Sequence, residues 1–166
     1  MPSTIRLSLA LACLLLFPAS GHTAEPHTPA GNHLQLSPAL MQLLKQEMNA
    51  IQKGMQELIP AIIAGNWQEA ADIGEHIRHS YIMQQALTDA QINELQHGLP
   101  PAFLELDQSF HHSAGMLAHA AKKHNAELVS FYFYKLTDTC VACHSKFAEY
   151  RFPGLVDGTN DTVHKH

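Results

Sequence analysis

The chain has 166 residues, of which 46% are apolar and 15% are charged, and its formal net charge at pH 7 is −5. This length suits one compact domain, and this composition excludes a largely disordered chain. The basic residues form no stripe or cluster, so we expect no nucleic-acid partner.

Residues 1–24 have the pattern of a secretory signal peptide. Arg6 precedes an apolar run from Leu7 to Phe17, and small residues follow, so cleavage is expected after Gly21 or Ala24. The run is much shorter than the roughly 20 residues that cross a bilayer. The sequence therefore predicts export to the periplasm, with no membrane span after cleavage.

Signal cleavage also simplifies the cysteines. Cys13 lies inside the apolar run, which makes a lipid anchor at this position the weaker alternative, and it is lost with the signal. The mature chain then keeps only Cys140 and Cys143. Two cysteines in an exported protein are able to form one disulfide. His144, which directly follows the second cysteine, indicates a different chemistry for this pair.

The mature chain is predicted to begin with a flexible lead-in, residues 25–36, followed by a first helix. Ser37 is a suitable N-cap, Pro38 suits the first helical position, and Gly65 suits the C-terminal end. Pro60 is expected to kink the last turn. Apolar residues recur every three or four positions along this helix: Leu40, Leu44, Met48, Ile51, Met55, Leu58 and Ile62.

Three further long helices follow the same periodicity, and a short helix is predicted between the first two of these three. The second helix is predicted to start after an Asn66 cap and to continue past Tyr81 towards Leu87. Thr88 and Gln91 form a capping-box pattern for a short helix that ends near Gly98.

The third long helix opens after Pro100-Pro101 and is expected to end near His124. Asn125 then caps a fourth helix that ends by Phe152. Residues 153–166 are predicted to be a loose tail. Long amphipathic helices with short connections over residues 37–152 predict an all-α, antiparallel four-helix bundle.

The fourth helix carries the sequence Cys140-Val141-Ala142-Cys143-His144, which is the C-x-x-C-H pattern of c-type haem attachment. Residues three and four positions apart share one face of a helix, so both thiols and the imidazole point the same way. The thiols are then able to add to the two vinyl groups of one haem, with His144 as the proximal iron ligand.

Three other interpretations of the pair Cys140 and Cys143 fit the sequence less well. A redox dithiol usually starts a helix after a strand, and the sequence predicts no strand. A structural zinc site needs two more ligands at matching spacing, and no second cysteine pair occurs. Chance occurrence is disfavoured by export, by the position late in a helix and by the absence of other mature cysteines.

The C-terminal position of the haem motif, on the last of four predicted helices, resembles the class II cytochromes c, the cytochrome c′ family. The resemblance covers residues 37–152 and implies a haem bundle, with a homodimer as a possible assembly. It also implies that the first helix faces the sixth iron position, and overlaying that helix on the family pattern places Met48 there. The family's usual basic residue is replaced by Ala148, so Lys146 or Arg151 is the candidate for that charge.

Met48 has a plainer interpretation as well, because methionine on an apolar helix face is often core filler. Met41 and Met55 lie one heptad on either side of it and share nearly the same stripe. Met55 or one of the 13 histidines is therefore the alternative sixth ligand. Most of those histidines are expected to lie on polar helix faces or in the tail.

The sequence thus predicts a non-enzymatic, periplasmic carrier of single electrons, with one haem c ligated by His144 and Met48 and with periplasmic redox proteins as partners. The alternative function is gas binding. High-spin members of the cytochrome c′ family leave the sixth position open and bind small gases such as nitric oxide. Which function applies depends on whether Met48 reaches the iron.

Overall fold

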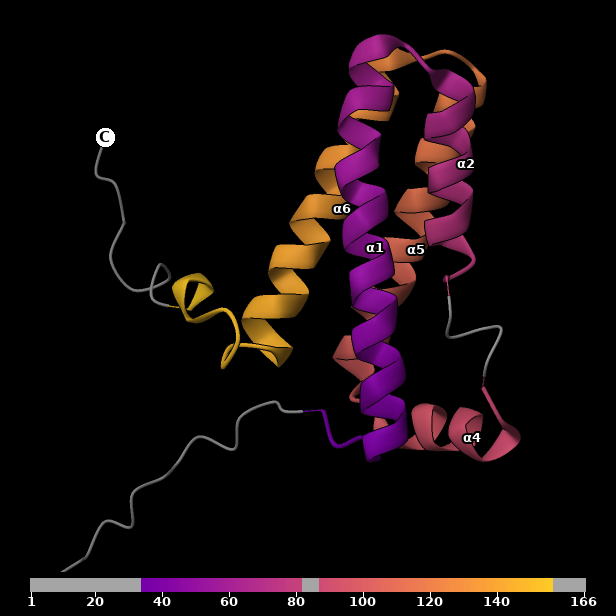
Figure 1. Cartoon of the computed structure of the whole chain (residues 1–166). Coiled ribbons are helices and arrows are strands. Elements are labelled where there is room, and N and C mark those ends of the chain that lie inside the picture. Colours follow the sequence, from indigo (N-terminus) through magenta and orange to yellow (C-terminus); the bar gives the residue numbers. More distant parts are fainter. Residues whose placement is uncertain (1–33, 82–86, 157–166) are drawn as a thin grey trace, which may run out of the picture.

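A computed structural model describes residues 34–81 and 87–156, and in these ranges the chain is all-α, with five α-helices packed antiparallel and no strands (Figure 1). The all-α prediction is confirmed. The helices are α1 (Pro38–Ala64), α2 (Trp67–Arg78), α4 (Asp89–Gly98), α5 (Pro101–Lys122) and α6 (Ala126–Phe147), and a short 3-10 helix, η1 (Pro153–Leu155), follows them.

The four longer helices, α1, α2, α5 and α6, are neighbours in that order around the domain. The most extensive packing is between α2 and α5 and between α5 and α6, whereas α1 and α6 touch only sparsely. Figure 1 shows α6 diverging from α1 towards its C-terminal end, and α4 lying across the end of the domain where α1 and α5 begin. The domain is therefore least closed between α1 and α6.

Several helix ends match the sequence prediction because their signals are local. The Ser37 side chain accepts a hydrogen bond from the Leu40 backbone N–H, and Gly65 ends α1 in the left-handed conformation, at φ 68°. Thr88 and Gln91 form the reciprocal capping box of α4. Asn125 caps α6 by accepting from the Leu128 N–H.

The end of the second helix was predicted wrongly, because α2 stops at Arg78 and not near Leu87. Ser80 turns the chain out of the helix at φ 62°, and the Tyr81 N–H then donates to the carboxylate of Glu47 on α1, over 2.9 Å. Glu47 is only 3% exposed. A buried acceptor on another helix therefore takes the backbone donor that a longer α2 would have used internally.

Asn66 is the N-cap residue of α2, as predicted, but it does not cap the helix through its side chain. Its side-chain amide donates instead to the Glu69 carboxylate over 2.6 Å. At the other end of the chain, α6 ends at Phe147, within the predicted limit of Phe152. Turns then lead into η1, a 3-10 helix at the start of the segment that was predicted to be a loose tail. The predicted signal peptide with Cys13, residues 25–33 of the lead-in and residues 157–166 of the tail lie outside the described residues.

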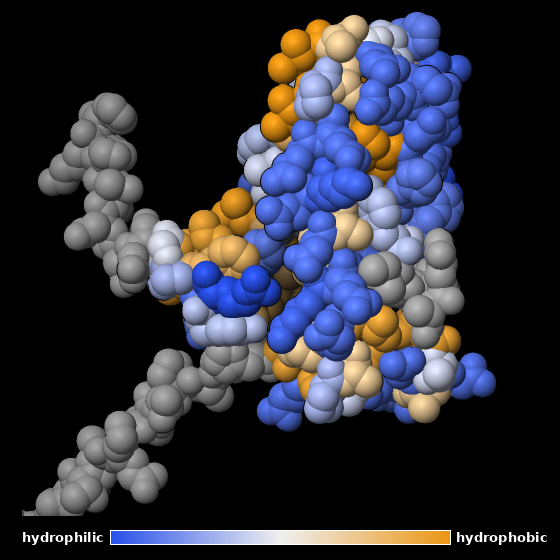
Figure 2. All heavy atoms as spheres, viewed as in Figure 1, coloured by the Kyte–Doolittle hydropathy of each residue, from blue (hydrophilic) through white to orange (hydrophobic). Residues whose placement is uncertain are grey.

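None of the helices in the described ranges combines the length and apolarity that a membrane crossing requires. In the space-filling view, hydrophilic side chains cover most of the outer faces of α1 and α2, and apolar ones gather on the part of α6 that diverges from α1 (Figure 2). Apolar side chains are also visible at the end of the domain where α1 and α2 meet and beside α4 (Figure 2).

Small residues bring α2 and α5 close together. Ala70, Ala71 and Gly74 on α2 pack against the α5 segment that contains Ala114 and Ala118, and all four alanines are fully buried. A Cβ atom at Gly74 would lie 3.0 Å from the Ala114 carbonyl oxygen and 3.0 Å from the Ala118 Cβ. Position 74 therefore requires glycine, because the backbone of α5 approaches it too closely for a side chain.

Gly74→Ala is expected to destabilise the protein by about 1–3 kcal/mol, the usual cost of overpacking a tight core, even though alanine favours a helix by up to about 1 kcal/mol over glycine. The measurement is urea unfolding of the purified protein. The two helices must separate to admit the methyl group, because backbone atoms of α5 occupy the space.

Gly115→Ala is the matched control, since a Cβ at Gly115 would meet only the flexible Arg78 side chain, at 2.7 Å. We expect this variant to be neutral or more stable than the parent by up to about 1 kcal/mol. Equal stabilities for the two variants would contradict the packing assigned to Gly74.

Candidate functional site

A large cavity of about 920 Å³ opens between α1 and α6 and extends to the first half of α5. Its volume lies near the upper end of the roughly 300–1,000 Å³ usual for ligand and cofactor sites. Most of the wall is apolar and aromatic, and includes Leu44, Ile51, Phe103, Phe110, Phe133 and Phe147. The cavity therefore has the size and the lining that a large, mostly apolar cofactor requires.

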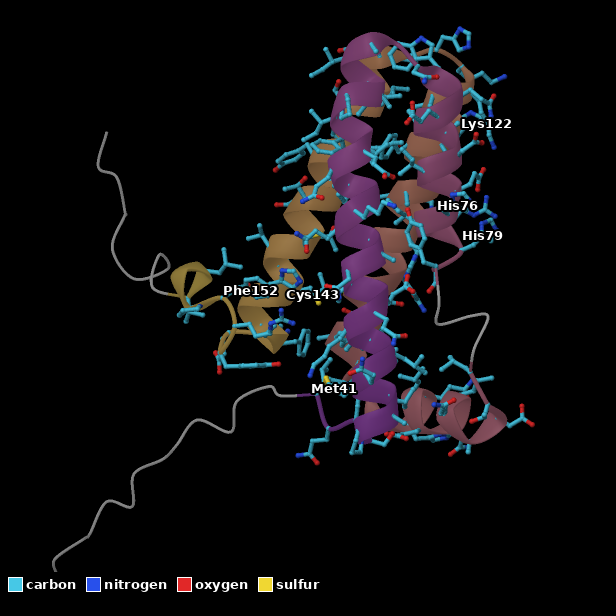
Figure 3. The ribbon with its side chains drawn as sticks, in the orientation of Figure 1. Met41, His76, His79, Lys122, Cys143 and Phe152 are labelled. Atoms are coloured by element: carbon cyan, nitrogen blue, oxygen red, sulfur yellow. The ribbon has the colours of Figure 1, made fainter. Side chains whose placement is uncertain are left out.

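One turn of α6 brings the three residues of the haem motif into this cavity. Cys140, Cys143 and His144 all line it, and both cysteines are half-buried free thiols. In the side-chain view, Cys143 lies on the side of α6 that faces α1 (Figure 3). The helical spacing thus puts two thiols and one imidazole on a single wall, as the sequence predicted.

The His144 ring is held by a second aromatic ring. It stacks on Phe152, with centroids 4.3 Å apart and an angle of 9° between the planes. Phe152 follows the turns after α6. Because the helix ends at Phe147, these turns fold back and bring Phe152 against His144. Burial, and then the Arg151 charge, lower the pKa of His144. The neutral imidazole, which is the form that binds metals, is therefore favoured.

The pKa values of the two thiols are shifted in the opposite direction from those of a redox dithiol. Burial, followed by the charges of Asp107 and Cys140, raises the pKa of Cys143 to about 11, and burial raises that of Cys140. Reactive dithiols depend on a lowered thiol pKa, usually at a helix N-terminus. Both conditions fail here, which disfavours the redox-dithiol interpretation of the motif.

The wall opposite the motif is α1. Met41, Met48 and Met55 all line the cavity from this helix, and in Figure 3 Met41 lies on the side of α1 that faces α6. Met55 packs against the hydrophobic core, whereas the side chain of Met48 is 37% exposed. Of these two, Met48 is the one whose thioether is not engaged in core packing.

Two cations lie at the cavity wall, Lys45 on α1 and Arg151 after α6. The guanidinium of Arg151 sits 5.7 Å from the Phe152 ring centroid, and the Lys146 ammonium sits 5.6 Å from that of Phe147. Of the two basic residues that the sequence offered near the motif, Arg151 is thus the one that lines the cavity.

Three features of the site were not predicted as functional. Phe152 was treated only as a helix limit. Asp107 received no role, and His111 was considered only as one of the 13 histidines, most of which were expected on polar faces or in the tail, yet both line the cavity. Their i, i+4 spacing on a helix that also places Phe103 and Phe110 at the cavity was the available signal.

The remaining histidines of the described ranges form no metal centre. Within residues 34–81 and 87–156, no group of three His, Cys, Asp or Glu side chains is placed to hold a metal ion. His79, for example, bonds the Glu75 carbonyl through Nδ1 and lies near the Glu75 carboxylate. His164 and His166 lie outside the described residues.

A scan of protein-family models and searches of curated proteins and of solved structures found no significant match to this chain. The functional assignment therefore rests on the residues and the geometry described above.

Proposed function

We propose that this chain is a mono-haem c-type cytochrome, similar to the class II family, that carries single electrons in the periplasm. One observation supports the proposal above all others. Cys140, Cys143 and His144 share one wall of an apolar cavity of about 920 Å³, and that wall faces a methionine-lined helix. The thiol and imidazole donors, the cavity size and the apolar lining all fit a haem.

In this proposal each residue of the motif has a distinct task. The Cys140 and Cys143 thiols add across the two vinyl groups and become thioethers, which fix the cofactor to α6. His144 supplies the proximal ligand, and the stack with Phe152 holds its ring in one orientation. The bound haem supplies a one-electron redox centre, and the protein sets its position, burial and potential.

Met48 is the proposed sixth ligand. It lines the wall opposite the motif, and its side chain is free of the core packing that engages Met55. Thioether ligation raises the reduction potential and leaves no open site on the iron. Lys45 and Arg151, the two cations at the cavity wall, are positioned to neutralise the carboxylates of a bound cofactor.

One observation favours a second candidate function, the binding of a small gas such as nitric oxide. The Met48 side chain is 37% exposed, and α1 touches α6 only sparsely, which leaves this side of the cavity wide. An iron that Met48 does not reach has an open sixth position. A gas-binding protein needs no redox partner, whereas an electron carrier requires one. A homodimer is compatible with either function.

The visible spectrum of the purified protein in both oxidation states tests these proposals. We expect the bands of a low-spin, six-coordinate haem c and a reversible one-electron titration. A high-spin spectrum that shifts when nitric oxide is added would transfer the assignment to gas binding. A protein that matures in a haem-exporting host without any haem bands would contradict both functions.

A further inference from the structure

His111 occupies an unusual place on the cavity wall. It lies on α5, one turn after Asp107, and both residues line the cavity together with Cys143. The His111 Nδ1 lies 2.7 Å from the Ile77 carbonyl oxygen, and Nε2 lies 3.5 Å from the Asp107 carboxylate. A carbonyl oxygen only accepts hydrogen bonds, so Nδ1 keeps its proton and Nε2 is the nitrogen that gains or loses one.

The charges around His111 are mostly negative. Asp107 lies on its own helix and Glu47 approaches from α1. Cys143 on α6 and Tyr81 after α2 are also nearby, but they are uncharged because burial raises the pKa of each. Burial lowers the pKa of His111, but the hydrogen bond and charge of Asp107, the Ile77 carbonyl and the charge of Glu47 together raise it above the ordinary value. His111 is thus a half-buried imidazole whose protonated form is stabilised by a neighbouring carboxylate.

We propose that His111 is a proton-binding group coupled to the redox state of the haem, which binds a proton when the haem is reduced and releases it when the haem is oxidised. This inference rests on the proposed haem function. In the forward direction ferric haem takes one electron from a periplasmic redox protein, and Nε2 of neutral His111 takes one proton from water. The products are ferrous haem and the His111 imidazolium paired with Asp107, and oxidation reverses both transfers.

The coupling follows from the charge of the iron centre. Ferric haem carries one more positive charge than ferrous haem, and it repels an imidazolium on the wall of the same low-dielectric cavity. The pKa of His111 is therefore lower in the oxidised protein than in the reduced one. By linkage, the reduction potential is constant below the lower pKa, falls with rising pH between the two, and is constant again above the higher pKa.

The experiment is a redox titration of the haem-loaded protein at a series of pH values. We expect the potential of the parent protein to fall with rising pH and that of His111→Gln to lose this dependence. His112→Gln is the matched control, because His112 is the exposed neighbour on the same helix, and it should retain the parental curve. The visible spectrum of each variant checks that iron coordination is unchanged.

Asp107→Asn provides a second arm that does not depend on replacing the imidazole. Loss of the carboxylate lowers the pKa of His111, so the whole region of falling potential should move to lower pH. A parent protein with a flat curve, or a His111→Gln variant that keeps the parental slope, would overturn the proposal. Absence of covalent haem would instead refute the proposed function, before any potential is measured.

Discussion

The double variant Cys140→Ala, Cys143→Ala is expected to lose covalent haem attachment completely, while the helices remain. Both thiols line the cavity on the same face of α6, and no other cysteine is present in the expected mature chain. Without the two thioethers the haem is held only by axial ligation and packing. The measurement is haem staining after denaturing electrophoresis, together with extraction into acidified acetone.

Val141→Ala is the matched control, because Val141 stands between the two cysteines but is exposed on α6. It should keep full haem staining. The double variant should also unfold at a lower temperature if it loses haem, because an apolar cavity without its occupant costs free energy. Persistent haem staining in the double variant would show that the attachment site lies elsewhere.

Met48→Leu is expected to convert the iron from low-spin to high-spin or five-coordinate and to lower its reduction potential, because an axial thioether favours ferrous iron. Leucine roughly conserves the volume of methionine, so the stability cost should stay below about 1.5 kcal/mol. Visible spectroscopy and potentiometric titration measure the two effects. Added nitric oxide or carbon monoxide should bind the variant more readily than the parent.

Met55→Leu is the comparison for this experiment, since Met55 lines the same cavity from the same helix but also packs against the core. Its spectrum should match that of the parent. A spectral change in Met55→Leu, with none in Met48→Leu, would transfer the ligand role to Met55. A parent protein that is already high-spin would favour gas binding.

The parts of the fold that the sequence predicted are those with local causes. The ends of α1 and the starts of α4 and α6 follow from caps that bond within three or four residues: Ser37, Gly65, Thr88 and Asn125. The end of α2 depends on a bond between Tyr81 and Glu47, which are 34 positions apart. A partner at that distance leaves no periodic signal in the sequence of α2.

The candidate site likewise combines local features, which the sequence predicted, with long-range contacts, which it did not. The spacing of Cys140, Cys143 and His144 on one helix face is a local property, and the sequence predicted it. The stack of Phe152 on His144 depends on the turns after α6, and the charges around His111 come from α5 and α1. The cavity itself exists because α6 diverges from α1, which neither helix encodes alone.

The central claim is covalent haem on Cys140 and Cys143, and the intact mass of the denatured, purified protein tests it most directly. The protein should be expressed with its signal peptide in a host that exports haem to the periplasm. We expect the mass of the polypeptide cleaved after Gly21 or Ala24 plus the mass of one haem, retained after extraction with acidified acetone. A mass equal to the cleaved polypeptide alone would contradict the account.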